Sequence, residues 1–278
     1  MDYLAAKISE IDWRSISCDE IDAILAARIK RYETSIRERG GKRPKREGYV
    51  IERIASIENL IAADNEAQKG KRKRRIERNG KVVLVTNRYI RLHNQRRMQD
   101  LRELQLMILT LEFPPCVFTA QEIMTDAGKI RVIVKQNFYP WRILHHAILR
   151  VIEPKVYCSL IPGTFACIKG RGLHYGVKLL KKMLRRHPEW KWFWKTDFKK
   201  FYQSIPHELI KSEFSALFKD RHFLRLIETV LFKYDSGEEI IQILIDETER
   251  TERNAHWCCH KSDDRQSHRK KNRPCGCV

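Results

Sequence analysis

The chain has 278 residues, and its 55 Lys and Arg against 35 Asp and Glu give a net charge of +20. This length allows one large domain or two ordinary ones, and a hydrophobic content of 42% is enough for a core. No membrane partner is expected, because a span needs about 20 apolar residues and the most apolar stretch, 104–113, contains Gln105, Thr110 and Glu112. Eight cysteines are too sparse for a secreted disulfide scaffold, which favours the cytoplasm. The charge excess predicts a polyanionic partner, with nucleic acid as the first candidate.

The N-terminal part has the pattern of a basic, mostly helical segment. Apolar residues at helical spacing predict one helix over 19–31, with Asp19 as its N-cap, and a second over 51–61. A basic loop containing Gly and Pro, 39–46, lies between them. The second helix leads into a dense cationic run, for which a solvated segment and a phosphate contact are both open. Its cations are Lys69, Lys71, Arg72, Lys73, Arg74 and Arg75.

Three elements are expected in the middle of the chain. Apolar spacing predicts a helix over 90–111. A change to alternation on both sides of a turn at 126–128 predicts a hairpin over 118–135. A further helix over 141–152 should end before Pro154, because a proline disfavours helical backbone in the residue before it.

Two more elements are expected before residue 235. The segment 190–198 is short and aromatic, which favours a buried strand whose three tryptophans pack in the core and at its rim. A helix begins near 204–206, where a proline suits the first turn. The residues of this helix that should face inward are Leu209, Ile210, Phe214, Leu217 and Phe218.

The segment with the clearest chemistry is 195–207. A strand would deliver the carboxylate of Asp197 to its end, beside an open edge, where it could hold a divalent cation. Tyr202, five residues later, would form a floor beside a bound sugar. Alone, such an aspartate is more often a turn former or a helix cap.

Several blocks together resemble the bacterial and phage reverse transcriptases. The segment 195–207 is similar to motif A of that family, and the blocks before it occur in the family's order. The resemblance covers roughly residues 55 to 235, and it is strongest to the diversity-generating retroelement and abortive-infection-like members of the family. The blocks are 69–72, 128–133, 139–147, 164–174 and 195–207.

The resemblance implies an α+β fold with right-hand polymerase fingers and a partial palm. The implied reaction is RNA-templated DNA synthesis, in which a DNA primer 3′-OH attacks the α-phosphorus of a dNTP. Asp197 and the backbone carbonyl of Phe198 would hold Mg²⁺, and Tyr202 would screen the sugar. Arg131, Lys169 and Arg171 would contact phosphates. For these three cations a solvent-facing strand residue and an ordinary basic turn remain the alternatives.

The sequence departs from the family in its second half. Two-metal phosphoryl transfer needs carboxylates on both sides of the ions. In the family that the sequence resembles, a Tyr-x-Asp-Asp motif supplies the second source of carboxylates, and the 278 residues contain no such motif. We therefore expect a catalytically incomplete chain, and we expect exposed strand edges to make it poorly soluble. A non-catalytic RNA-binding remnant, or half of a split protein, is the alternative function. A maturase-like splicing cofactor would require a further domain.

The expected organisation has three parts: a basic helical extension (1–88), fingers and partial palm (89–254), and a tail that cannot build a core (255–278). The tail has four of the eight cysteines and no Ile, Leu, Phe or Met. Back-translation of 256–268, read one base later, permits a string that resembles motif B of the family, so we interpret the tail as out-of-frame sequence. A zinc site is the competing interpretation, although the spacing of its cysteines fits no ordinary zinc knuckle. These cysteines are Cys258, Cys259, Cys275 and Cys277.

Overall fold

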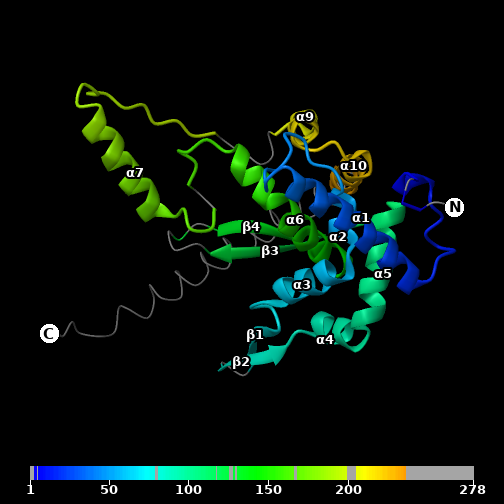
Figure 1. Cartoon of the computed structure of the whole chain (residues 1–278). Coiled ribbons are helices and arrows are strands. Elements are labelled where there is room, and N and C mark those ends of the chain that lie inside the picture. The colour runs from blue at the N-terminus through cyan, green and yellow to red at the C-terminus, as the bar shows by residue number, and fades with distance from the viewer. Residues whose placement is uncertain are drawn as a thin grey trace, which may run out of the picture.

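The computed structural model describes a mostly helical chain with two small hairpins (Figure 1). The described residues are 3–4, 6–78, 81–116, 118–124, 128, 130–165, 168–198 and 205–235. The helices are η1 (Ile8–Glu10), α1 (Cys18–Glu38), α2 (Val50–Ala55), α3 (Ile57–Gln68), α4 (Arg88–Gln95), α5 (Arg97–Thr110), η2 (Phe138–Arg142), α6 (Ile143–Ser159), α7 (Leu173–Arg186), α9 (His207–Leu217) and α10 (Arg221–Asp235). The strands are β1 (Lys73–Arg78), β2 (Lys81–Thr86), β3 (Phe118–Met124) and β4 (Ile130–Gln136).

Helix α1 confirms the first predicted helix but begins at a different cap. The hydroxyl of Ser17 accepts a hydrogen bond from the backbone N–H of Glu20, and the Glu20 carboxylate accepts one from the N–H of Ser17. This reciprocal pair satisfies two of the free donors at the helix start. The prediction that Asp19 is the N-cap is therefore wrong.

Two further helix predictions each miss a break. The predicted helix over 51–61 is divided into α2 and α3 at Ser56, whose extended backbone ends α2 and whose hydroxyl accepts a hydrogen bond from the N–H of Asn59 to cap α3. The predicted helix over 90–111 is divided into α4 and α5 at Arg96. Neither break contains Gly or Pro, the residues that usually mark helix ends in a sequence.

One hydrophobic core joins helices from both halves of the chain. Side chains of α2, α3, α5, α6 and α10 contribute fully buried members, and Figure 1 shows these helices gathered at one end of the molecule. Representative members, each 0% exposed, are Ile51, Leu60, Leu104, Leu144 and Phe223. The expected boundary at residue 88 stays a prediction, but the helices on its two sides pack together.

Asp220 connects the two halves through hydrogen bonds to two helix ends. Its Oδ2 accepts from the backbone N–H groups of Val50 and Ile51, at 2.9 and 3.0 Å. Its Oδ1 accepts from those of His222 and Phe223, both at 3.1 Å. One carboxylate therefore caps α2 and α10 at once, and each cap satisfies donors that the helix itself cannot.

Helix α6 confirms the helix predicted over 141–152 but does not end before Pro154. The helix continues to Ser159 with the proline inside it. Pro154 has no N–H for the carbonyl of Arg150, four residues earlier. The prediction of an end before the proline is wrong, and the buried residues of the helix are Ile143, Leu144, Ala147, Ile148 and Ile152.

The predicted hairpin over 118–135 is confirmed. Strands β3 and β4 pair antiparallel, with Phe118 opposite Gln136 and Met124 opposite Ile130. Gly128 in the connection has φ 70°, a left-handed backbone that favours glycine. A second antiparallel hairpin, β1–β2, was not predicted, and the cationic run passes into its first strand.

The prediction of a buried strand over 190–198 is wrong. These residues form no strand, and Trp192, Phe193 and Trp194 are 95%, 92% and 91% exposed rather than packed in a core. A strand is stable only beside a partner, and no described strand lies next to this segment. The helix predicted after it is present as α9, but Leu209 is 52% exposed, so that part of its inward face is also wrong.

Candidate functional site

Asp197 lies at the exposed end of the segment that follows α7. Phe198, whose carbonyl the resemblance assigns to the same ion, has a side chain that is 73% exposed. Carboxylate and carbonyl oxygens suit Mg²⁺, yet the described residues contain no group of three His, Cys, Asp or Glu side chains that could hold a metal. The described part of the chain therefore does not by itself form a two-metal centre. Tyr202 and the tail from 255 to 278 lie outside the described residues.

Lys169 and Arg171 lie in a tight turn that leads into α7. The N–H of Arg171 donates to the carbonyl of Ile168 at 3.0 Å, and Gly170 adopts φ 79°. The Arg171 guanidinium lies 5.8 Å from the ring centroid of Tyr175, and Lys169 is exposed. Residues 168–171 therefore form a basic turn, and this turn leaves the ammonium of Lys169 accessible to an anion.

The other predicted cations belong to the two hairpins. Arg131 is in β4, opposite Ile123 of β3, and the structure does not describe its side chain. In the cationic run, Lys69 follows α3, and the side chains of residues 71–73 are exposed. Arg72 donates from Nε to Gln68 at 3.3 Å. The last two cations, Arg74 and Arg75, are in β1, and their side chains are likewise outside the description.

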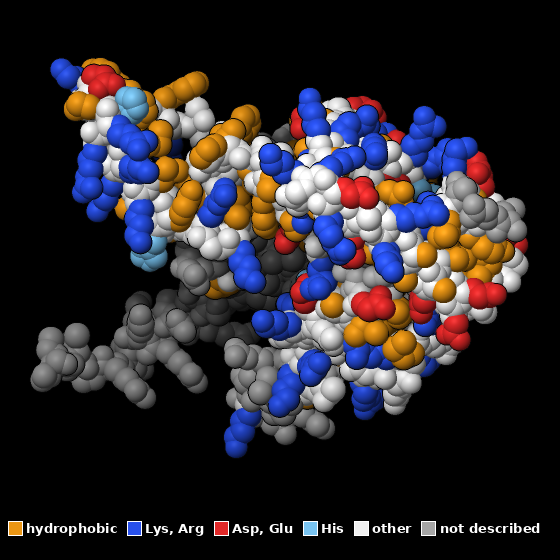
Figure 2. All heavy atoms as spheres, viewed as in Figure 1, with side chains coloured by type: hydrophobic (Ala, Val, Ile, Leu, Met, Phe, Trp, Pro, Cys, Tyr) orange, Lys and Arg blue, Asp and Glu red, His pale blue; other side chains and the backbone are white. Residues whose placement is uncertain are grey.

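Helix α7 has a cationic surface that the sequence prediction did not single out. Its fourteen residues include no Asp or Glu. Figure 2 shows Lys and Arg side chains beside hydrophobic ones over α7, and further Lys and Arg side chains near β1 and β2. The exposed cations of α7 are Lys178, Lys181, Lys182, Arg185 and Arg186. Since none of them pairs with a carboxylate among the described residues, their charge is available to an anionic ligand.

A buried polar network involving His93 was missed by the sequence prediction. His93, 4% exposed, donates from Nδ1 to Asp100 at 2.7 Å and from Nε2 to Asp64 at 3.2 Å. Asp64 also accepts from Arg97 at 2.6 Å and from Gln68 at 2.9 Å. The network joins α3, α4 and α5. A sequence signal existed, because both aspartates occupy buried positions on helices whose other buried positions are mostly apolar.

The charges of this network stabilise one another. Burial alone would lower the pKa of His93, but hydrogen bonds to Asp64 and Asp100 outweigh it and raise that pKa. Burial would raise the pKa of Asp64, but hydrogen bonds from His93, Gln68 and Arg97 lower it. Both ring nitrogens of His93 are occupied and the ring is buried, so the network acts as a clamp between helices rather than as an acid–base site.

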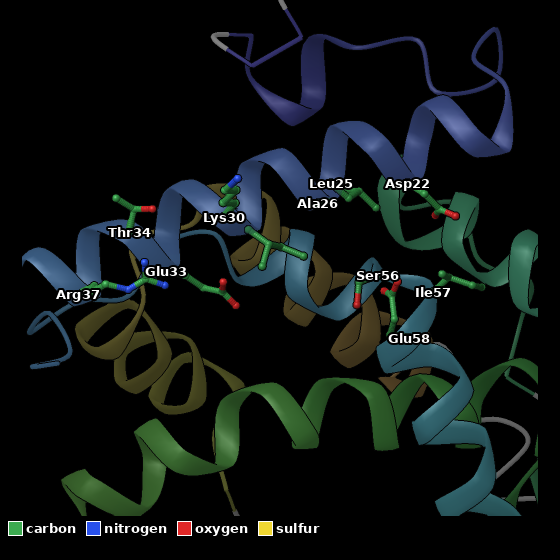
Figure 3. A pocket seen from close by; sticks show the side chains of 11 residues that line it. Asp22, Leu25, Ala26, Lys30, Glu33, Thr34, Arg37, Ser56, Ile57 and Glu58 are labelled. Carbon is green, nitrogen blue, oxygen red and sulfur yellow. The ribbon is translucent and has the colours of Figure 1, made fainter.

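A cavity of about 390 Å³ lies between α1 and the junction of α2 with α3 (Figure 3). Figure 3 shows side chains of both charges around it, including Asp22, Lys30, Glu33 and Arg37. Asp22 already accepts hydrogen bonds from Arg102 and Gln105. The mixed charge gives no preference for an anion, and none of the predicted site residues lines the cavity.

The described helices include none with the length and apolar composition needed to cross a membrane. Among the predicted site residues, exposed cations lie in the 168–171 turn and the segment around 69–73, and α7 adds further exposed cations. Comparison with known proteins adds no identification: no family model matches this chain, and the search of curated proteins finds no significant match.

Proposed function

We propose that this chain binds RNA as the fingers and partial palm of a reverse-transcriptase-type polymerase. The observation that carries the proposal is the set of cations without carboxylate partners on α7 and in the 168–171 turn, in a chain with a net charge of +20. The order of the sequence blocks, which resembles that of reverse transcriptases, supports RNA as the polyanion.

Within this proposal the named residues have distinct tasks. Lys169, Arg171 and Arg131 contact template or triphosphate oxygens, and Lys69 with the cations after it extends this contact along the RNA. Asp197 is the carboxylate that faces the primer end. Mg²⁺, when bound, would neutralise charge on the dNTP, but the described residues are too few to form its site, so no catalytic step is assigned to them.

Salt dependence of RNA binding tests the proposal. For a single strand, log K falls with log salt with a slope of about −0.7 per phosphate contact. We expect steep salt dependence for the wild type and a slope shallower by about 0.7 for Lys169→Gln. Lys30→Gln, the same change at an exposed position on α1, is the matched control and should leave the slope unchanged. Weak binding that is insensitive to salt would refute the proposal.

A non-catalytic RNA-binding protein is the second candidate. It is supported by the exposure of Asp197 and by the lack of a metal-binding group among the described residues. Primer extension on an RNA template with Mg²⁺ tests the second candidate, because a non-catalytic protein cannot extend a primer. Because the 278 residues contain no Tyr-x-Asp-Asp motif, we expect no extension and RNA affinity unchanged in Asp197→Ala. Extension that Asp197→Ala abolishes would show a complete catalytic centre and would exclude the second candidate.

A further inference from the structure

The segment after α7 carries a row of exposed aromatic side chains. A turn begins it, in which the N–H of Trp190 donates to the carbonyl of His187 at 3.1 Å. The rings of His187 and Trp190 stack, with their centroids 4.3 Å apart and an interplanar angle of 7°. Beyond the turn, Trp192, Phe193 and Trp194 are each more than 90% exposed. We call residues 190–195 the aromatic ribbon. Figure 1 shows that the chain leaves α7 there in an extended path.

The aromatic ribbon interleaves flat rings with cations. Its rings alone would also suit a strand or a protein interface, but they are accompanied by lysines, in the order Trp, Lys, Trp, Phe, Trp, Lys. Flat rings next to cations are what single-stranded nucleic acids require, because bases stack on the rings and phosphates pair with the cations. Because lysine is depleted at protein interfaces and the chain has a net charge of +20, the lysines favour a nucleic-acid strand over a protein surface.

The cations for the phosphates come from the ribbon and from the helix that precedes it. Lys191 and Lys195 alternate with the rings, and both are exposed. The last turns of α7 add Lys181, Lys182 and Arg185, all exposed and without carboxylate partners among the described residues. Because the 187–190 turn joins helix and ribbon directly, one strand can contact both.

We propose that the aromatic ribbon and the cationic end of α7 form a binding site for single-stranded RNA, with bases stacked on Trp192, Phe193 and Trp194. In an extended chain, side chains two residues apart lie on the same side at a spacing of about 6.6 Å. This is about twice the 3.4 Å rise of stacked bases. The spacing lets one base insert between Trp192 and Trp194, while Phe193 faces the other side. The inference rests on the proposed function and names the surface that holds the unpaired strand.

The test measures binding of a fluorescein-labelled 12-nucleotide oligouridylate to the full chain by anisotropy. In Trp192→Ala/Trp194→Ala the affinity should fall at least about tenfold, the size expected for loss of one or more base stacks. The salt slope should be unchanged, because no phosphate contact is removed. Lys181→Gln/Lys182→Gln should instead make the slope shallower. Phe232→Ala on α10, where the ring is 66% exposed, removes an aromatic side chain elsewhere and should change neither quantity.

Two more readouts make the test specific to the ribbon. A duplex RNA of equal length should bind the wild type and the double tryptophan variant equally, because its bases are not free to stack. The oligouridylate should also quench tryptophan emission in the wild type much more than in the double variant. Equal thermal midpoints for the two proteins would show that the exposed rings are not needed for folding.

The possible failures are distinguishable. If the wild type binds no RNA, the proposed function and this inference both fail. If it binds and the tryptophan variant binds equally well, the inference fails and the proposed function stands. If acrylamide cannot quench the tryptophans of the ribbon in the free full chain, another polypeptide segment or a second copy covers them, and the RNA site is refuted.

Discussion

The double cap made by Asp220 predicts a large loss of stability from one substitution. Asp220→Ala removes the acceptor for four backbone N–H groups, two at the start of α2 and two at the start of α10. Loss of one N-cap costs about 1 kcal/mol, with a range of roughly 0.5 to 2. Two caps therefore give a loss of about 2 kcal/mol, which for a chain of this size lowers Tm by about 4–8 °C.

Urea unfolding followed by far-ultraviolet circular dichroism measures this loss. Asp220→Asn retains one carbonyl oxygen, so it should cap one helix and lose about half as much free energy of unfolding. Glu228→Ala, at an exposed position on α10, should stay within about 0.5 kcal/mol of the wild type. A loss below 0.5 kcal/mol in Asp220→Ala would refute the idea that this carboxylate holds the two helices.

The same experiment tests how the halves of the chain are coupled. The core includes residues from both sides of residue 88, so we expect a single cooperative transition in the wild type. Asp220→Ala should shift that transition without dividing it, because the core contacts of Ile51 and Phe223 remain. Two separated transitions in the wild type would show that residues 1–88 fold as an independent unit.

Three further predictions follow from buried groups. The pKa of His93 is raised above its unfolded value of about 6.5. The stability that protonated His93 contributes to the fold is therefore fully present below pH 6.5 and is lost as pH rises through the folded pKa. In urea unfolding from pH 5 to 9, the stability advantage of the wild type over His93→Gln should shrink at high pH. Burial next to His146 and Arg142 lowers the pKa of His145 to about 4. Protonation of His145 therefore favours the unfolded chain, and the stability of the wild type relative to His145→Gln should rise from pH 4 to 6.5. Gly176→Ala would place a Cβ 2.7 Å from the ring of Phe165, and the cost of moving that ring opposes a gain of about 1 kcal/mol from removing a helical glycine. We therefore expect Gly176→Ala to be about 1 kcal/mol more favourable in a Phe165→Ala background than in the wild type by the same unfolding assay, and equal effects in both backgrounds would contradict that packing.

Periodicity predicted the elements whose packing surface is continuous. The alternation of Ile130, Val132 and Val134 identified the β3–β4 hairpin, and apolar spacing over 141–152 identified α6, although Ile152 rather than the expected Val151 is the last buried residue of its apolar face. Period alone could not locate the breaks at Ser56 and Arg96, because the apolar spacing continues across both. At Ser56 the break depends on an extended backbone and a hydroxyl cap, a local preference that is weaker than the signal of a Gly or Pro.

The candidate site was less predictable than the fold because its parts depend on contacts between distant segments. The turn at 168–171 followed from its glycines and cations, which are local. The clamp around His93 joins three helices, and nothing in the spacing of residues 64, 93 and 100 indicates that they meet. The cationic surface of α7 was visible in the sequence, but its lack of carboxylate partners could be read only from the structure.

The segment 190–198 shows where a pattern and its environment lead to different conclusions. Aromatic residues favour strands because they fit a pleated, half-buried surface, and that preference predicted burial. Burial also requires a second surface, and no described strand or helix face lies against Trp192 or Trp194. The lysines between the rings then become informative, because lysine is depleted at protein interfaces, whereas bases that stack on flat rings bring phosphates that pair with cations. Exposure and composition together, rather than either alone, support the proposal that this segment binds nucleic acid.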